Sequence, residues 1–364
     1  MHIISYHTFQ LSNFLIHRYK YIAQLLRLSG RNQVKTFTMF LVFGGIGAII
    51  CALLGVITNG MTMLVILKQK KVRDNLIAPI LFMMCFSNFV FSLVCLPLRA
   101  LQLFGWFVDD SFCQYFPLLY FPTVFVSILT CALISLNRAL ALRNHAFAKR
   151  VFTWKKTILY YNLMWLVSIG VMMLPFYKVW GKLGLLDVFN QCALMETESG
   201  NPQNGLFSIS MGITIPVVVF SVASIYCWMR SSTKEALYAC GDLSPDLIEQ
   251  FVKHEAQVTK TSLVLIGFFA ILYIPNFLIA IFIPIDDLPG LHIAGYMVVW
   301  CWVFVNPVIY VVGNRSFRLA FKITFGLTLN PNESVTLNLL KKPSDQSAKL
   351  NWKKMVESEK KSSV

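Results

Sequence analysis

The sequence predicts an all-α membrane protein, namely a seven-transmembrane helix bundle with a short amphipathic cytoplasmic helix after the seventh span. The chain is 56% hydrophobic and only 13% charged, whereas about a quarter of the residues in an average soluble domain are charged. Seven stretches contain no Lys, Arg, Asp or Glu and reach the roughly 20 residues that a spanning helix needs. No other stretch is long and charge-free enough.

The basic residues predict how the spans are oriented. The charge-free stretches are 36–67, 75–98, 111–137, 157–177, 199–229, 261–285 and 288–314. The connecting segments on one side hold 24 Lys and Arg, and those on the other side hold 3. The basic set comprises 68–74, 138–156, 230–260 and 315–364. Because cytoplasmic loops carry the excess of Lys and Arg, we expect a multi-pass plasma-membrane protein with its N-terminus outside and its C-terminus in the cytoplasm.

The charge distribution also bounds the partners and divides the chain. A net charge of +15 indicates nucleic acid in a soluble protein, but topology and anionic lipid head groups account for cations in short loops and a tail. We therefore expect no nucleic acid partner. The predicted regions are an extracellular N-terminal segment at 1–35, a membrane domain at 36–325 and a disordered cytoplasmic tail at 326–364. The cations of the first region run against the orientation rule; a mobile basic tail or a start codon placed too early would account for them.

The first two spans each carry an amide in apolar surroundings, Asn59 and Asn88, and Pro97 ends the second. Such an amide is expected to face the bundle interior and to hydrogen-bond there. We assign Asn59 and Asn88 as interior polar residues. The alternative is that they only join neighbouring helices.

The third span begins at Cys113 and ends at Asn137-Arg138. An arginine cannot lose its charge and is costly to leave unpaired in hydrocarbon. The fourth and fifth spans contain Trp165, Pro175 and Pro216. We therefore expect the end of the third span to need a partner for its charge.

The sixth and seventh spans contain prolines that are expected to bend them. Pro275 frees a backbone carbonyl and makes a plausible hinge. The seventh span ends in Asn306-Pro307-Val308-Ile309-Tyr310. The run that follows places Phe317 and Phe321 on one face and Arg318 and Lys322 on another, which is typical of an interfacial helix.

Together these residues resemble the rhodopsin-like (class A) G-protein-coupled receptors. The resemblance covers residues 38–325, and its marks are Asn59, Pro97, Cys113, Arg138, Trp165, Pro175, Pro216, Pro275, Asn306, Pro307 and Tyr310. The run from Val179 to Gly184 and the Asn-Arg at the third helix look like the insect moody and trapped in endoderm group. The resemblance implies that ligand binding outside the cell is transmitted to heterotrimeric G proteins, in cell migration or epithelial barrier control. Arrestin and a receptor kinase are the further partners it implies.

The resemblance also implies a disulfide between Cys113 and Cys192, both on the outer side and so in an oxidising compartment. This bridge would hold the loop at 178–198 across the mouth of the bundle. Trp106 resembles the aromatic residue that the family packs beneath the bridge.

A G-protein coupling and switch set follows from the same resemblance. It comprises Asn137, Arg138, Glu255, Tyr273, Pro275, Asn306, Pro307 and Tyr310. Glu255 stands where a subset of the family carries the acid that holds the third-helix arginine; a solvated charge is the alternative. Tyr273 replaces the usual tryptophan and can act as an aromatic lever at the base of the ligand site.

The ligand-binding residues that the resemblance implies are Tyr120, Phe121, Val124, Ser208, Asn276, Phe277, Tyr296 and Trp300. An amine receptor needs an acid at the position of Tyr120, and an opsin needs a lysine at the position of Trp300, so we expect neither an amine nor retinal. An aromatic, nearly uncharged lining suits a lipid or a small neutral molecule. The alternative is that these aromatic residues only pack the helices.

Some positions depart from the family pattern: Asn88, Asn137, Ala139, Ser224 and Tyr273. Asn88 stands where an aspartate is usual, so we expect sodium to bind poorly. A receptor fold that has lost G-protein coupling is therefore an alternative.

A membrane transporter is a further alternative, and an intramembrane enzyme is a weaker one. A transporter would show inverted repeats or acids within its spans, and an intramembrane enzyme would show metal-ligand clusters or a nucleophile motif. We see neither pattern and expect no enzyme, cofactor or metal. The final Ser362-Ser363-Val364 also fits the C-terminal ligand of a PDZ domain.

Overall fold

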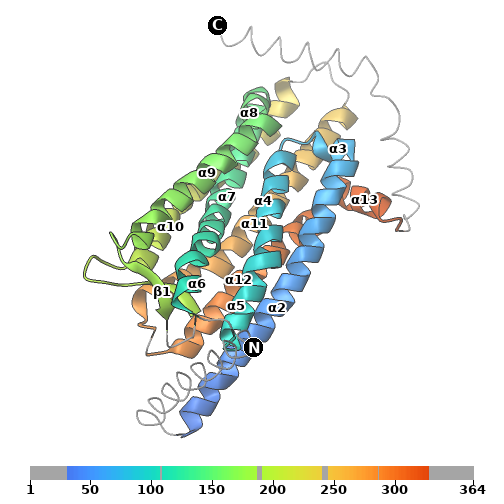
Figure 1. The fold of residues 1–364 in the computed structure, drawn as a ribbon. Coiled ribbons are helices and arrows are strands. Elements are labelled where there is room, and N and C mark those ends of the chain that lie inside the picture. Colours follow the sequence, from blue (N-terminus) through green and yellow to red (C-terminus); the bar gives the residue numbers. More distant parts are fainter. Residues whose placement is uncertain (1–30, 107–108, 187–190, 240–244, 286, 328–364) are drawn as a thin grey trace.

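Seven helices cross the molecule side by side (Figure 1). The computed structural model describes residues 31–106, 109–186, 191–239, 245–285 and 287–327. Within these residues the helices long and apolar enough to span a membrane cover Thr38–Lys68, Ala78–Leu103, Asp110–Arg143, Trp154–Phe176, Pro202–Cys227, Thr259–Phe282 and Pro289–Gly313. The predicted number of spans is confirmed. The predicted N-terminal segment and tail fall outside the described residues, except for 31–35 and 326–327.

The secondary structure within these spans is interrupted in two of them. The first span is α2 (Arg31–Lys68), and the fourth to seventh are α9 (Trp154–Phe176), α10 (Pro202–Ala239), α11 (Pro245–Phe282) and α12 (Pro289–Gly313). The second consists of α4 (Ala78–Val90), the π-helical η1 (Phe91–Cys95) and α5 (Leu96–Leu103). The third consists of α6 (Asp110–Tyr115) and α7 (Pro117–Arg143).

The second span is longer than its charge-free stretch predicted. That stretch stops at 98, before Arg99, but α5 continues to Leu103 and buries Arg99, which is only 4% exposed. Pro97 follows the π-helical turn η1 directly, where the Leu96 N–H donates to the Phe91 carbonyl, so the helix continues through Pro97 without a break. Arg99 therefore lies inside the bundle and not in an outer loop.

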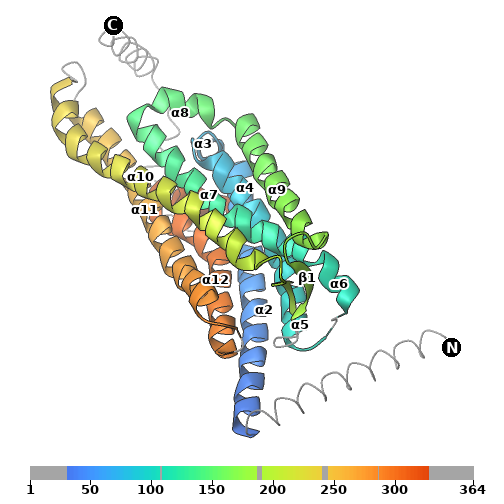
Figure 2. The same cartoon turned by 90° about the vertical axis from the view of Figure 1, so that its left-hand side faces the viewer.

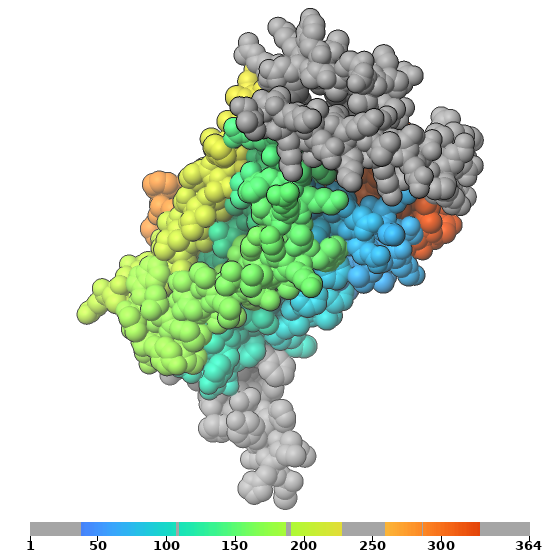
Figure 3. Space-filling model, turned by 90° about the horizontal axis from the view of Figure 1, so that it is seen from above, coloured from blue at the N-terminus to red at the C-terminus, as the bar shows by residue number. Residues whose placement is uncertain are grey.

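The third span is the centre of the bundle. In the most apolar stretch of the third span 78% of the residues are buried, whereas in the corresponding stretch of the fourth span 22% are buried. α7 packs against α10, α9, α4 and α11, and Asp109 caps α6 by accepting from the Phe112 N–H at 2.7 Å. The space-filling view in Figure 3 shows the green surface of α9 between the yellow-green of α10 and the blue of the first two spans. Residues of α7 can therefore contact both halves of the bundle.

A short hairpin closes one end of the bundle. Its strands β1 (Lys182–Leu186) and β2 (Gln191–Met195) pair antiparallel, with Leu185 opposite Cys192. A disulfide joins Cys192 to Cys113 in α6, as predicted. We call this the hairpin end, formed by β1, β2, α5 and α6; Figure 2 shows it opposite the end that carries the short helices α3 (Lys70–Arg73) and α8 (His145–Val151).

Gly181 allows the chain to enter this hairpin. Its φ is +68°, and a Cβ there would lie 2.4 Å from the Pro202 ring. Only glycine adopts such a conformation readily, and only glycine leaves this room. The hairpin is thus fixed at both of its ends, at Gly181 and at the disulfide.

Trp106 does not pack beneath the disulfide, contrary to expectation; it is 62% exposed. Gly105, with a φ of +82°, ends the helix, and the Trp106 N–H donates to the Leu101 carbonyl at 2.8 Å. The rings that stack beside Cys113 are Phe112 and Phe116, with centroids 5.3 Å apart.

The amphipathic helix after the seventh span is confirmed as α13 (Arg315–Thr324). It buries Phe317, Leu319 and Ala320. The Asn314 side chain caps it by accepting from the backbone N–H groups of Ser316 and Phe317, and Gln69 Nε2 donates to Thr324 Oγ1 at 3.0 Å. These contacts dock α13 against the chain between α2 and α3, at the end opposite the hairpin.

Candidate functional site

A cavity lies beneath the hairpin, between the second, third, fifth, sixth and seventh spans. It encloses about 550 Å³, including the part open to solvent, which is an upper bound on the volume of a ligand. Its lining is Arg99, Tyr120, Phe121, Val124, Leu186, Gln191, Cys192, Ala193, Gln203, Phe207, Asn276, Tyr296, Val299 and Trp300. The hairpin covers this cavity and supplies part of its wall.

The structure brings together most of the residues that the sequence suggested for ligand binding. Those at the cavity are Tyr120, Phe121, Val124, Asn276, Tyr296 and Trp300. Ser208 is exposed on α10, where its neighbour Phe207 faces the cavity, and Phe277 is half-buried outside the lining. Five aromatic or polar side chains and one valine, from three helices, thus converge on one site.

Arg99 changes the expected character of this lining. Its Nη1 donates to Gln102 Oε1 at 3.1 Å, to Gln191 Oε1 at 3.0 Å and to the Cys192 carbonyl at 3.0 Å. Its guanidinium carbon lies 4.2 Å from the ring centroid of Tyr120, within the range of a cation–π interaction. The cavity is therefore not nearly uncharged, as its aromatic residues had suggested.

Gln102 joins the hairpin to the second span. Its Oε1 accepts from the Cys192 N–H at 3.1 Å as well as from Arg99. One side-chain oxygen thus serves both the backbone of β2 and a buried cation, so the position of Arg99 depends on the position of the hairpin.

One further hydrogen bond crosses the cavity between helices. Trp300 Nε1 in α12 donates to the Tyr120 hydroxyl in α7 at 2.9 Å. Gln203 of α10, Tyr120 and Arg99 are neighbours of the Tyr296 hydroxyl. The cavity wall is therefore cross-linked by polar contacts, and a ligand that displaces one of these groups changes how α7, α10 and α12 pack.

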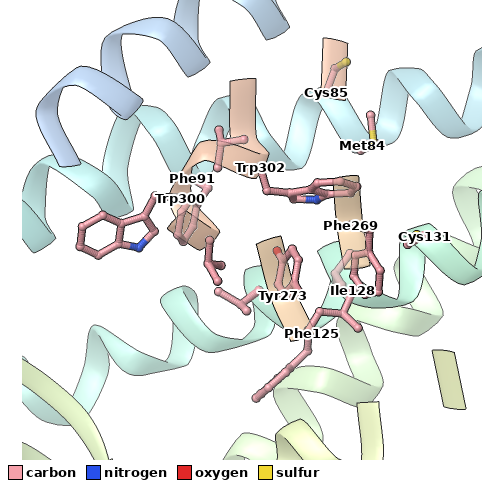
Figure 4. Packing of buried hydrophobic residues seen from close by; sticks show 14 of the residues in the cluster. Met84, Cys85, Phe91, Phe125, Ile128, Cys131, Phe269, Tyr273, Trp300 and Trp302 are labelled. Atoms are coloured by element: carbon pink, nitrogen blue, oxygen red, sulfur yellow. The ribbon is translucent and has the colours of Figure 1, made fainter. Parts of the chain in front are cut away.

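An aromatic cluster lies below the cavity, and Figure 4 shows its members Phe269, Tyr273 and Trp302. Tyr273 stacks on Phe269 at 4.9 Å between centroids and meets the Trp302 ring edge-to-face at 5.8 Å. Trp302 Nε1 donates to Ser127 Oγ at 3.0 Å, and Ser127 is also a hydrogen-bonding neighbour of Tyr273. The cluster connects α11 and α12 to α7, and Tyr273 lies two residues before Pro275, a proline inside α11.

Amides from three helices lie in the middle of the bundle. Asn59 Nδ2 donates to the Gly55 carbonyl at 2.8 Å and to the Val303 carbonyl at 3.0 Å, which joins α2 to α12. Asn88 Nδ2 and both side-chain polar atoms of Asn306 are buried without a hydrogen-bond partner among the described residues. Buried polar atoms of this kind are usually satisfied by water. Asn59 and Asn88 are thus both buried.

The third helix ends in a buried arginine. Arg138 is 4% exposed, and it lies close to Tyr310 of α12, which also has Ser262 of α11 as a neighbour. Asn137 is fully buried, and neither of its side-chain polar atoms has a partner among the described residues. The side chain of Glu255, the predicted counter-ion, lies outside the described residues. Three helices therefore meet around Arg138.

This arrangement defines a class of membrane receptor: a cavity covered by a disulfide-held hairpin at one end, a buried arginine at the other, and an aromatic cluster between. The sequence pattern of the 7 transmembrane receptor (rhodopsin family) matches residues 58–310, and the chain belongs to this family. It is a multi-pass membrane protein and a G-protein-coupled receptor.

Two curated relatives are similar along most of the chain. Protein trapped in endoderm-1 of Drosophila melanogaster is 24% identical in an alignment 308 positions long that covers 79% of this chain and 78% of that protein. The G-protein coupled receptor moody of the same species is 22% identical in an alignment 342 positions long that covers 78% of this chain and 51% of that protein. Squid rhodopsin has the same fold, with a TM-score of 0.72 at 21% identity, covering 85% of this chain and 93% of the rhodopsin chain.

The sequence did not indicate Arg99, Gln102, Gln191 or Gln203 as site residues. Arg99 is the first charged residue after the stretch 75–98, so a rule that ends a span at its first charge places Arg99 in the following outer loop. The spacing of Arg99 and Gln102, three residues apart, places both on one face if the second span continues past its last uncharged residue. Gln191 begins β2 and Gln203 is the second residue of α10. No spacing rule relates either residue to the third span.

Proposed function

We propose that the receptor lies in the plasma membrane with the hairpin end outside the cell, and that it binds an extracellular ligand in the cavity beneath the hairpin. The disulfide between Cys113 and Cys192 supports this orientation, since such bonds persist in oxidising compartments. The excess of Lys and Arg in the loops at the other end supports it as well.

Ligand binding would be transmitted through the aromatic cluster of Phe269, Tyr273 and Trp302. A ligand that prefers one packing of these rings shifts the balance between two states of the bundle. α11 can then swing about Pro275, and the surroundings of Arg138 change where α7, α11 and α12 meet. The observation that carries this proposal is the burial of Arg138 in contact with helices that also line the cavity.

The partners of the activated state are a heterotrimeric G protein and then arrestin and a receptor kinase, which would act on serines of the tail. A PDZ-domain protein would bind the terminal Val364. These tail residues lie outside the described residues, so the support for these partners is the family and the sequence.

Ligand-independent recruitment of G-protein alpha subunits in cells tests the proposed function. The natural protein and Arg138→Ala are compared at equal surface level against a panel of subunits. We expect recruitment of at least one subunit by the natural protein and its loss in Arg138→Ala. Recruitment that is equal in both proteins would contradict the role of Arg138. If no subunit responds, and Glu255→Ala is silent too, a receptor fold without coupling explains the chain better.

A further inference from the structure

The hairpin end of the cavity has more buried hydrogen-bond donors than acceptors. Arg99 Nε has no hydrogen-bond partner among the described residues. The side-chain oxygens of Gln102 and Gln191 both face Arg99 Nη1, and their amide nitrogens, also buried, have no partner in the described part of the chain. The opposite amide orientation would direct N–H groups at a cation, so these nitrogens are fixed as surplus donors.

Tyr120 supplies one more donor. Its hydroxyl oxygen accepts from Trp300 Nε1, and tryptophan cannot accept in return. The hydroxyl hydrogen of Tyr120 therefore has to find another acceptor, and no described residue provides one. This hydrogen lies in the same wall as Arg99, whose guanidinium is over the Tyr120 ring.

The charge of Arg99 is not balanced within the described structure. Of the described residues that line the cavity, only Arg99 is charged. Its contacts there are neutral oxygens and the rings of Phe116 and Tyr120, at 5.3 and 4.2 Å from the centroids. A buried guanidinium keeps its charge and is costly to hold without an anion. The acid nearest to the cavity in sequence, Asp187, lies outside the described residues.

We propose that the cavity binds an amphiphilic anion, whose carboxylate or similar anionic oxygen group is held by Arg99 and the Tyr120 hydroxyl and whose apolar body lies along Phe121, Val124 and Phe207. The proposal rests on the proposed function, because it takes this cavity as the ligand site. The planar guanidinium matches the geometry of a carboxylate, and the three apolar side chains line the same cavity. A small inorganic anion would leave that apolar wall unoccupied, and a cation would be repelled by Arg99.

Octanoate is the probe, and octan-1-ol and octylamine are its neutral and cationic counterparts with the same chain. The measurement is the unfolding midpoint Tm of the purified full-length receptor in neutral-lipid nanodiscs, as a function of probe concentration. We expect octanoate to raise Tm at lower concentrations than either counterpart. In Arg99→Gln the half-saturating concentration of octanoate should rise about ten- to a hundredfold, the loss expected for a charge-assisted hydrogen bond.

Three other variants separate this role from a structural one. Lys182→Gln removes an exposed cation of β1 and should leave the octanoate response unchanged. Arg99→Lys keeps the charge and should keep the preference for octanoate over octan-1-ol. This variant tests the role of the charge even if Arg99→Gln does not fold. Tyr120→Phe keeps the ring under Arg99 and should weaken octanoate by a smaller factor than Arg99→Gln does.

Several outcomes would overturn the proposal. The first is a rise in Tm with octan-1-ol equal to that with octanoate, and the second is an unchanged rise with octanoate in Arg99→Gln. The third is no rise with any probe up to its solubility limit. The fourth is a rise with octanoate that occurs only in Asp187→Asn. Recruitment of G-protein subunits is measured on the same proteins. If recruitment depends on Arg138 but octanoate does not bind, the ligand proposal fails and the receptor function stands. If octanoate binds through Arg99 but no subunit is recruited, the receptor function fails and the ligand proposal stands.

Discussion

At the scale of single residues, amides take positions where this family usually has acids. Asn88 and Asn137 are both buried, at 2% and 0% exposure, and each has a side-chain atom without a partner among the described residues. An amide carries no charge, so it costs less to bury than a carboxylate, but it attracts cations less strongly. The interior of this bundle is therefore expected to depend little on bound cations.

Restoring the acid at the first of these positions should make the protein respond to sodium. In Asn88→Asp a carboxylate replaces an amide whose nitrogen has no described partner, so no described side-chain hydrogen bond is lost. A hard cation prefers anionic oxygen ligands and would offset the cost of the buried charge. We expect NaCl to raise the Tm of Asn88→Asp relative to the chloride of a bulky organic cation, and not to change that of the natural protein.

Asn59→Asp is the matched control. Its Nδ2 donates to two backbone carbonyls, of Gly55 and Val303, and a carboxylate would oppose both oxygens. We expect a loss of about 1 to 3 kcal/mol, the usual cost of buried groups left unsatisfied, in either salt. A sodium response of equal size in Asn59→Asp would show that the effect at Asn88 is not specific to its position.

At the scale of elements, the hairpin is attached to the bundle at the disulfide, at Gln102 and at Arg99. Removing the covalent attachment should affect stability and the cavity together. Cys192→Ser opens a bridge that spans 79 residues, and the loss of a native disulfide typically costs about 2 to 5 kcal/mol. We expect a lower Tm that is no longer sensitive to a reducing agent, whereas Cys227→Ser, at an exposed free thiol, should behave as the natural protein does.

The contact between the third and sixth helices is the second prediction at this scale. Because Asn137 offers Arg138 no negative charge, the inactive state is expected to depend on Glu255. Glu255→Ala should therefore raise ligand-free recruitment of G protein, and Asn137→Asp should lower it. Both are compared at equal surface expression with Lys253→Ala, which removes a neighbouring charge. An unchanged basal level in Glu255→Ala would exclude this ion pair.

The helices were predictable from the sequence to the extent that hydrocarbon excludes charge. Each span is long, apolar and bounded by charged residues, so counting charges located all seven. The same rule failed at Arg99, because contacts from β2 and from aromatic rings can hold a cation inside a bundle, and these contacts come from residues distant in sequence. Tyr273 was expected at this site only through the family resemblance, by its position two residues before Pro275. Its neighbours Phe269 and Trp302 were not expected, and the hydrogen bond from Trp302 to Ser127 could not be, because it joins residues 175 positions apart.

At the scale of the whole molecule, polarity is arranged opposite to that of a soluble protein. Large apolar side chains such as Leu53 and Leu166 are 61% and 66% exposed on outward faces, whereas Asn59, Asn137 and Asn306 are fully buried. Lipid covers the former, and the bundle interior satisfies or hydrates the latter. The two ends differ as well, since the disulfide lies at one and the basic loops at the other.

This asymmetry predicts the orientation, and epitope accessibility measures it. A tag placed before residue 31 should bind antibody on intact cells, and a tag after Val364 should bind only after permeabilisation.

Basic loops resist translocation, so removing cations from the first of these loops should weaken the preferred orientation. Replacing Lys70, Lys71 and Arg73 by Gln is expected to yield a fraction of molecules with the first tag inside the cell. The control is the same number of Gln substitutions at Lys341, Lys342 and Lys349, far from any span end, which should leave the orientation unchanged. A first tag that is inaccessible on intact cells in the natural protein would reverse the orientation and place the cavity beneath the hairpin on the cytoplasmic side.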